Sequence, residues 1–224
     1  FSEYVANYRV DGKPFSAFAK TTTDFEFNSQ HIVNALKFGA EWNMSKNFGE
    51  GQIYDLSHPL STKGWGSRPR QYNEIPASHT LSLYVQDYIT ARIGRHLLEA
   101  RIGARSTSIL GLPKEYAMHG KFYLDPRINL QWTLPHFGEK QWSISFSGGI
   151  GRTTKMPTMN YLYPDANYID IIQLAYYNQS NPAECSRYNI LSDKEDATNY
   201  ALQPARNLKG EFRVDFEVEG YRLW

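Results

Sequence analysis

The chain has 224 residues and a formal net charge of +1, so its charge gives no reason to expect a nucleic-acid partner. Its mean hydropathy is -0.55, and it contains no apolar run of the about eighteen residues that a membrane helix needs. Cys185 is the single cysteine, which excludes an internal disulfide and a cysteine-based metal site. Aromatic residues make up 15% of the chain, a content that favours strands and membrane interfaces.

Two segments near the N-terminus alternate between apolar and polar residues. Apolar or small residues take every second position from Phe15 to Phe27, and the same pattern restarts from Ile32 to Met44. Two-residue alternation predicts strands with one apolar and one polar face. Residues 45–78 are rich in Gly, Pro, Ser and Asn and have no sustained period, so we expect a long loop there.

Five further strands are predicted along the rest of the chain. Residues 81–89 and 98–104 alternate on either side of a tight R-I-G-R turn, and Asp87 falls on their apolar face, close to that turn. The pattern returns in residues 122–134 and 142–150 around a P-H-F-G-E-K turn. A second long loop, residues 153–206, precedes a last strand at residues 211–218.

The glycine-rich stretch at Gly148, Gly149 and Gly151 invites comparison with phosphate-binding loops. A P-loop requires G-x-x-x-x-G-K-[ST], whereas Gly151 is followed by an arginine and two threonines. A dinucleotide fingerprint requires a third glycine where Thr154 stands. Neither pattern matches, so we interpret these glycines as the end of a strand with small residues on both faces.

Strand length and loop order distinguish a membrane barrel from a soluble sandwich. The predicted strands run about 12 residues, roughly twice the usual length, which at a tilt near 45° matches the hydrocarbon thickness of a bilayer. Short and long connections alternate, and aromatic residues on the apolar face lie near the strand ends: Phe15, Phe25, Phe27, Trp42, Phe122, Trp132 and Trp142. We therefore expect an all-β fold, an antiparallel transmembrane β-barrel whose apolar faces contact outer-membrane lipid.

Five motifs carry a resemblance to a known family. They are A-L-K-F-G-A-E-W from Ala35, L-S-L-Y-V-Q-D from Leu81, the G-A-R from Gly103, D-P-R-I-N-L from Asp125 and G-G-I-G-R-T-T-K-M-P-T-M-N-Y-L-Y-P from Gly148. The chain resembles the barrel of a TonB-dependent outer-membrane transporter of the Bacteroidetes type. The resemblance runs from about residue 15 to the end, and its last motif is the most specific.

That resemblance implies a fold and a set of partners. Members of the family are 22-stranded barrels with short periplasmic turns, long extracellular loops and an N-terminal plug. They import scarce solutes such as iron chelates, corrinoids, glycans or peptides with energy from TonB. With about seven to eight strands, residues 1–224 are expected to be an internal part of one such barrel domain in the outer membrane of a Gram-negative bacterium. The plug and TonB then lie outside this chain, and a surface lipoprotein over the loops is a further candidate partner.

Two groups of residues are candidate contacts for the solute or the plug. Charged residues on the polar faces of the strands are expected to face the lumen, where they contact plug or solute or pair with one another: Lys37, Glu41, Arg101, Arg105, Arg127, Arg213 and Asp215. Arginine and aromatic residues of the long loops are candidates for binding a solute, or for packing the loops together: Trp65, Arg68, Arg70, Tyr72, Tyr161, Tyr163, Tyr168, Tyr176 and Tyr177.

No motif for catalysis or metal binding is present in the sequence. The six histidines are scattered without H-E-x-x-H spacing, there is no G-x-S-x-G, and Asp165 and Asp170 lack the other ligands of an EF-type loop. We expect no enzyme activity, cofactor or metal. Besides active transport, two functions remain open: a passive outer-membrane porin, and a soluble glycan-binding β-sandwich.

Overall fold

The computed structural model describes residues 7–55, 68–138, 142–177, 180, 186–218 and 221–223. Most of them form antiparallel strands, which confirms the all-β prediction. Within these ranges the longest helix, α1 (Met159–Leu162), has four residues, and none is long and apolar enough to cross a membrane. The chain folds as two compact units, which are described separately.

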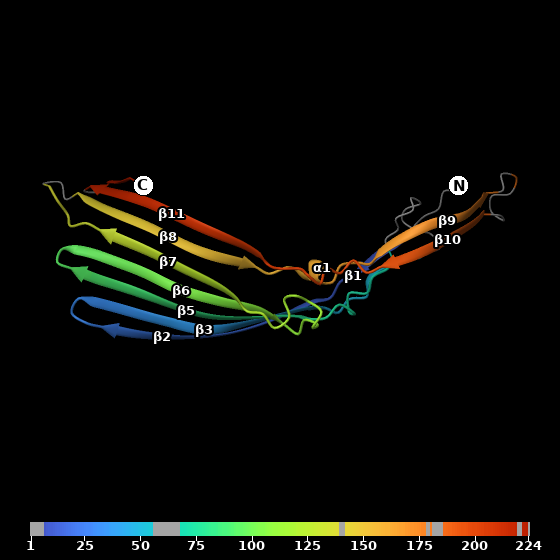
Figure 1. The fold of residues 1–224 in the computed structure, drawn as a ribbon, viewed down its shortest axis with the longest axis horizontal. Coiled ribbons are helices and arrows are strands. Elements are labelled where there is room, and N and C mark those ends of the chain that lie inside the picture. The colour runs from blue at the N-terminus through green and yellow to red at the C-terminus, as the bar shows by residue number, and fades with distance from the viewer. Residues whose placement is uncertain are drawn as a thin grey trace. The chain divides into compact units, whose positions relative to one another are not determined.

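The first unit, here called the sheet unit, comprises Phe18–Asn43, His79–Met156 and Gln203–Trp224. It is built on one sheet of long neighbouring strands (Figure 1). In spatial order the strands are β12 (Tyr221–Leu223), β11 (Ala205–Val218), β8 (Ser143–Lys155), β7 (Tyr123–Thr133), β6 (His96–Leu110), β5 (Ser78–Ile93), β3 (Ile32–Asn47) and β2 (Pro14–Asn28). Each long strand of this sheet therefore lies beside the long strand that precedes it along the chain.

Connections between the long strands alternate in length as predicted. Two or three residues join β2 to β3 and β5 to β6, and Gly94 in the second of these turns has φ of 64°, which glycine adopts without steric cost. The connections at the opposite end, residues 48–77, 111–122 and 156–204, are much longer. Residues 134–142 complete the short set between β7 and β8. An up-and-down sheet thus has its short turns at one end and its long connections at the other.

Register places the apolar side chains of neighbouring strands in one continuous face. Ala100 is opposite Leu130, and Ile102 is opposite Ile128, which in turn is opposite Ile150. Leu130 is 47% exposed and Ile102 is 45% exposed. Within the described residues of the sheet unit, these side chains are therefore not covered by a second layer of the same unit. We call this continuous face the apolar face.

A small core lies where the connection between β6 and β7 leaves the sheet. Leu112, Tyr116 and Met118 of this connection are buried together with Ile109 and Tyr123 at the adjoining strand ends. The Nδ1 atom of His119 lies 2.6 Å from the Leu112 carbonyl oxygen. This connection is therefore compact and is anchored to the sheet unit by apolar side chains.

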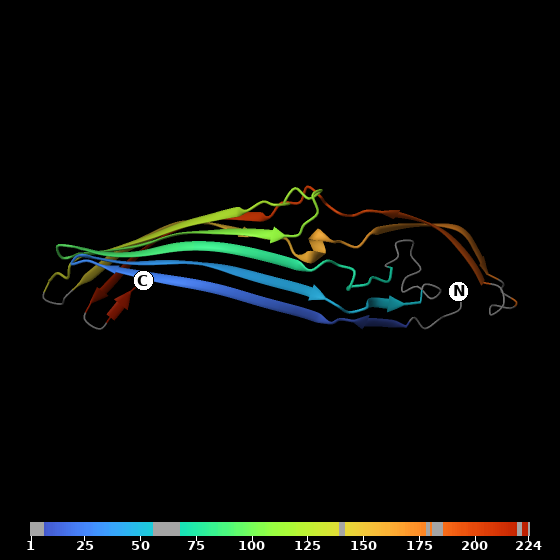
Figure 2. The same ribbon diagram turned by 90° about the horizontal axis from the view of Figure 1, so that it is seen from below.

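The second unit, here called the loop unit, comprises Phe1–Ala17, Met44–Ser78 and Pro157–Leu202. It holds two short antiparallel sheets, β1 (Tyr8–Asp11) with β4 (Gly51–Tyr54), and β9 (Asn167–Tyr177) with β10 (Ser186–Glu195). Figure 2 shows β9 and β10 as one hairpin.

The predicted long loops at residues 45–78 and 153–206 are long connections in the structure, but they contain regular structure that the sequence pattern did not indicate. β3 extends into the first and β4 lies inside it, while the second contains α1, β9 and β10. β4 is too short to show a period. In the hairpin, Leu174 is opposite Asn189 but Ile172 is opposite Ile190, so Gln173 is an extra residue in a bulge. A bulge breaks the two-residue alternation on which the sequence reading depends.

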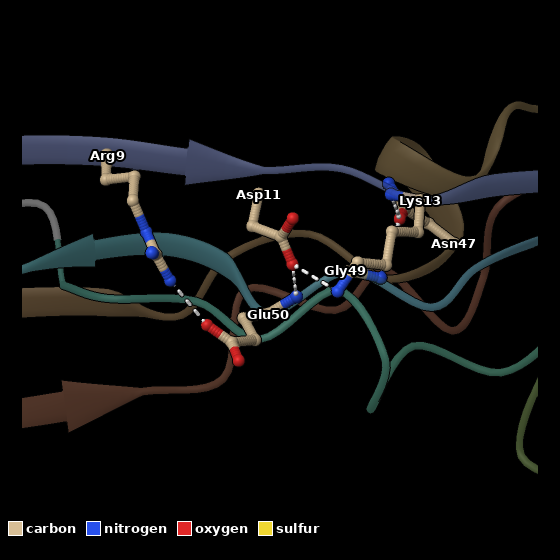
Figure 3. A network of polar contacts seen from close by, with 6 residues as sticks. All are labelled: Arg9, Asp11, Lys13, Asn47, Gly49 and Glu50. Atoms are coloured by element: carbon tan, nitrogen blue, oxygen red, sulfur yellow. Dashed lines mark hydrogen bonds and ion pairs between the residues drawn. The ribbon is translucent and has the colours of Figure 1, made fainter.

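Polar contacts join β1 to the segment before β4 (Figure 3). The Arg9 guanidinium lies 2.7 Å from the Glu50 carboxylate, and the backbone N–H of Glu50 donates to the Asp11 carboxylate at 2.9 Å. The Lys13 ammonium lies 3.1 Å from the same Asp11 carboxylate. Asn47 Oδ1 accepts from the backbone N–H groups of Lys13 and Gly49. The hydrogen bond from Glu50 is the main reason that the pKa of Asp11 is lowered from its ordinary value of 3.8.

This lowered pKa predicts an acid-dependent opening of the β1–β4 pair. A carboxyl whose pKa is lower in the folded state stabilises that state above its unfolded pKa of 3.8, and this contribution is lost as pH falls through the folded value. Hydrogen exchange of the Glu50 amide should therefore lose protection below about pH 4. In Asp11→Asn the protection should be weaker at neutral pH and should not change with acid; an unchanged acid dependence in that variant would contradict the assignment.

Candidate functional site

Polar and charged side chains gather on the side of the large sheet opposite the apolar face. On β3, the Glu41 carboxylate lies 3.1 Å from the Arg105 guanidinium of β6 and accepts a hydrogen bond from Asn43 at 3.1 Å. The Lys37 ammonium lies 3.3 Å from the Asp24 carboxylate of β2. These pairs cross between strands because alternate residues of neighbouring strands share a face. We call this side the polar face.

The Tyr84 side chain lies across Gly39 on this polar face. Its hydroxyl oxygen lies 2.5 Å from Thr22 Oγ1. A Cβ built on Gly39, in the strand between them, would lie 2.7 Å from the Tyr84 hydroxyl and 2.2 Å from the Thr21 carbonyl oxygen. Because any larger residue there would collide with backbone, Gly39 is needed for the tyrosine to lie across β3.

The polar face contains a hollow of about 800 Å³, here called the larger hollow. Residues of all seven long strands line it. Gly149 and Gly151 of β8 add no side chains to its wall. A Cβ on Gly149 would lie 2.0 Å from Asn129 Oδ1, and one on Gly151 would lie 3.1 Å from Arg127 Cβ. The glycine-rich stretch therefore lies in a strand, as predicted, although the strand continues beyond the predicted end to Lys155, and it leaves room for the side chains of β7.

A second, smaller hollow of about 260 Å³ lies on the same face toward the short turns. Serines 143, 145 and 147 of β8 line it together with Arg213 and Asp215 of β11. The Arg213 and Asp215 side chains form an ion pair at 2.5 Å. The two hollows thus differ in size and in the charges that surround them.

Register places all seven charged residues of the predicted lumen set on the polar face. Lys37, Glu41, Arg105 and Arg127 line the larger hollow, and Arg213 and Asp215 line the smaller one. The Arg101 guanidinium lies 5.0 Å from the centre of the Tyr88 ring, whose hydroxyl donates to Glu99. Whether these side chains contact a plug or a solute stays a prediction.

Several residues that line the larger hollow were missing from the predicted site. Lys20 alternates with the apolar or small residues between Phe15 and Phe27, so the alternation that selected Lys37 also indicates Lys20. Lys209 precedes the predicted last strand, but β11 begins at Ala205 and carries Lys209 opposite Gly151. Leu208 continues the apolar positions of this strand, but Gly210 has no side chain and Arg206 is polar at the next apolar position, and this concealed the start of the strand.

In the loop unit, the side chain of Arg68 contacts the hairpin of β9 and β10. Its Nη2 atom lies 2.5 Å from Asp170 Oδ1 and 3.1 Å from Ser192 Oγ. The guanidinium also lies 4.8 Å from the centre of the Tyr168 ring, over which the Lys194 ammonium lies at 5.9 Å. Two members of the predicted loop set, Arg68 and Tyr168, are therefore brought together in one cluster.

Arg70 makes a second connection within the loop unit. Its guanidinium lies 2.7 Å from the Asp165 carboxylate and donates to the Tyr163 carbonyl oxygen. Burial raises the pKa of the Tyr163 phenol. Both arginines of the predicted set are thus paired with carboxylates of the same unit, as expected of residues that pack the loops together. Their binding to a solute stays a prediction.

The other members of the predicted loop set are placed less centrally or lie outside the description. Tyr161 is 68% exposed, and Tyr72 is half-buried. Trp65 lies outside the described residues, as do the side chains of Tyr176 and Tyr177, whose backbone belongs to β9.

Removal of the Arg68 side chain should loosen the hairpin. The Asp170 side chain is 7% exposed, so Arg68→Ala leaves a buried carboxylate without its ion pair and should cost about 2 kcal/mol of local stability. Proteolytic cleavage in the hairpin, measured under conditions where it follows the open population, should then accelerate about 30-fold. Lys194→Ala is the matched control, because this exposed ammonium contacts the same ring and should matter little. Equal rates in the two variants would contradict the assigned role of Arg68.

In the part of the chain that is described, no three His, Cys, Asp or Glu side chains are grouped so as to hold a metal ion. Comparison with family models, curated proteins and solved structures found no match to the chain.

Proposed function

We propose that this chain forms part of the wall of an outer-membrane β-barrel, and that the barrel is an active transporter that imports a scarce solute. The observation that supports the proposal best is the exposed apolar face of the large sheet. Leu83, Ile102 and Leu130 are each close to half exposed on three neighbouring strands. A contiguous apolar surface of this kind is costly in water and is favourable against acyl chains.

Strand lengths agree with a bilayer. β6 has 15 residues, which at about 3.3 Å per residue and a tilt near 45° rise about 35 Å along the membrane normal. The hydrocarbon core is about 30 Å thick. Trp132 and Phe146, whose ring centres are 6.2 Å apart, lie near the short turns, where an aromatic girdle is expected. In this proposal the short turns are periplasmic and the long connections are extracellular.

Lipid contact is tested with the full-length protein in vesicles that contain brominated lipids. The Trp132 ring is 47% exposed on the apolar face and should be quenched by bromine on the acyl chains. The difference between the protein and its Trp132→Phe variant isolates that signal from the other tryptophans. If the Trp132 signal is not quenched although the protein is in the vesicles, this face does not contact lipid.

Active transport is distinguished from passive diffusion by the swelling of vesicles. An open porin admits a small sugar such as arabinose, so vesicles that contain it swell in an iso-osmotic arabinose solution. A barrel that is closed by a plug should not admit the sugar. Rapid swelling with the full-length protein would therefore favour a porin and contradict the proposed active transporter.

A further inference from the structure

We propose that the larger hollow of the polar face attracts anionic groups, so that the solute is a small molecule carrying carboxylate or phosphate groups. The inference rests on the proposed function, in which the polar face is reached by water. Three carboxylates line the hollow: Glu41, Asp125 and Glu211. Six cationic side chains surround them: Lys20, Lys37, Arg105, Arg127, Arg152 and Lys209. Six positive and three negative charges leave a formal net charge of +3.

Four of the cations have no carboxylate partner among the described residues, and one of these, Arg152, donates to the Leu124 carbonyl oxygen. The Lys20 ammonium lies 5.8 Å from the centre of the Tyr84 ring, and Arg127 donates to the neutral Gln86 side chain at 2.7 Å. For Lys20, Arg127 and Lys209, no described carboxylate lies within ion-pair distance. Their charges are therefore available to an anion that enters the hollow.

Two of the remaining cations are already neutralised, as is one of the acids. Lys37 pairs with Asp24, and Arg105 pairs with Glu41. The Asp125 carboxylate accepts hydrogen bonds from the backbone N–H and the hydroxyl of Thr154, at 2.9 and 2.6 Å. Asp24 does not line the hollow, so its pairing with Lys37 lowers the excess by one, and four cations against Asp125 and Glu211 leave a formal charge of +2.

The hollow has room for a ligand. Its volume of about 800 Å³ falls in the range of small-molecule sites, roughly 300–1,000 Å³. Gly149, Gly151 and Gly210 contribute no side chains to the lining, so the space between the long cationic side chains stays open. The Asn129 amide lies over Gly149 and supplies a neutral polar group beside the cations.

The smaller hollow provides a natural comparison on the same face. Arg213 is its one cation, against the two carboxylates of Asp215 and Glu217. Its formal charge is therefore -1, and neutral serine, threonine and glutamine side chains complete the lining. An attraction for anions that depends on these lining charges should be confined to the larger hollow.

The test compares the modification of single cysteines by an anionic and a cationic reagent. In the full-length protein in vesicles, with Cys185 and any cysteine outside residues 1–224 replaced by serine, Asn129→Cys places a thiol in the larger hollow and Ser145→Cys places one in the smaller hollow. Ala100→Cys places a thiol on the apolar face. The reagents are sulfonatoethyl and trimethylammonioethyl methanethiosulfonate, and each rate is divided by the rate with a free thiol in solution.

At Asn129→Cys the corrected ratio of anionic to cationic rates should be about tenfold or more, because a cleft of one charge raises the local concentration of counter-ions by about 10 to 10³. At Ser145→Cys the ratio should be one or lower. Citrate and inorganic phosphate, added separately at constant ionic strength, should slow the anionic reagent at Asn129→Cys, and the stronger competitor identifies carboxylate or phosphate as the preferred group.

Charge reversal in the hollow should invert the preference. Arg127→Glu with Lys209→Glu should bring the ratio at Asn129→Cys below one. Arg101→Glu is the matched control, because Arg101 lies on the same face but does not line the hollow, so the ratio should stay close to the starting value.

The possible failures have different meanings. If Asn129→Cys reacts with both reagents at similar rates, the polar face is reached by water but the hollow does not attract anions, and only this inference is overturned. If Ala100→Cys reacts and Asn129→Cys does not, the apolar face meets water and the proposed membrane orientation fails. If neither reagent reaches Asn129→Cys and Ala100→Cys is also unreactive, the hollow is filled by protein and does not bind a solute.

Discussion

Leu130→Arg should destabilise the protein in lipid vesicles by about 2–4 kcal/mol, whereas Gln131→Arg should change its stability by less than about 1 kcal/mol. The two residues are neighbours on β7 and project from opposite faces of the sheet. Leu130 is 47% exposed on the apolar face, opposite Ala100 of β6. Gln131 lies on the polar face, opposite Ser147, and lines the smaller hollow beside Asp215 and Glu217.

The difference arises from where the guanidinium comes to lie. On the apolar face the proposed membrane would force a charged group against acyl chains or require a local distortion of the bilayer. On the polar face the same group meets carboxylates and water. Denaturant titration of the full-length protein in vesicles measures both changes in the free energy of unfolding. A larger loss in Gln131→Arg than in Leu130→Arg would show that the faces are oriented the other way.

A soluble protein would also respond to Leu130→Arg in a way that can be recognised. If the apolar face were covered by a second layer of protein, the substitution would be costly in detergent-free buffer, and the wild-type protein would stay in solution there. The proposed barrel instead needs lipid or detergent for both proteins. The substitution therefore tests the environment of the face and not only its burial.

The alternation of residues was sufficient to predict the long strands, because each strand of the sheet has one apolar face. Val85 and Ile102, for example, are on the apolar face in the structure as they are in the sequence pattern. The turn at Gly94 was equally predictable, since a short polar segment with glycine separates two alternating runs. Local signals of this kind do not depend on how distant segments meet.

The structure of the loop unit could not be predicted in this way. β1 and β4 have four residues each and are held by contacts between segments about forty residues apart, such as Arg9 with Glu50. The hairpin of β9 and β10 contains a bulge that moves its apolar residues out of phase. Neither the pairing of distant segments nor an extra residue in a strand can be recognised from two-residue alternation.

The candidate site was predictable to the same limited extent. Alternation assigns Arg105 and Arg127 to the polar face, but it does not say which charges of other strands they approach. The larger hollow brings Lys20 of β2 and Lys209 of β11 into one lining, and these strands lie near opposite edges of the sheet. Its net charge therefore follows from the register and curvature of the whole sheet.

Gly51→Ala should have the other large effect, a loss of roughly 2–4 kcal/mol in the local stability of β4 and the segment beside it. Gly51 has φ of 83°, a left-handed conformation that costs a residue with a side chain about 1–3 kcal/mol. A Cβ at this position would also lie 1.9 Å from the Arg70 carbonyl oxygen. Backbone must move to relieve that contact, since neither atom belongs to a flexible side chain.

The displaced backbone takes part in two hydrogen bonds. The Gln52 N–H donates to the Arg70 carbonyl at 2.9 Å, and the Arg70 N–H donates to the Gln52 carbonyl at 3.2 Å. Each contributes about 1 kcal/mol. When the segment at residue 70 moves, the Arg70 guanidinium is also drawn from Asp165, to which it is bound at 2.7 Å. The substitution thus weakens one of the two arginine connections in the loop unit.

Hydrogen exchange of the Gln52 and Arg70 amides measures this effect, and both should exchange roughly 30- to 1000-fold faster in Gly51→Ala. Gly94→Ala separates conformational strain from steric collision, because Gly94 has φ of 64° but a Cβ there would meet no atom within 4 Å. That variant should cost about 1 kcal/mol. If the two alanines are equally costly in their own neighbourhoods, the close approach of Arg70 to Gly51 does not constrain the loop unit.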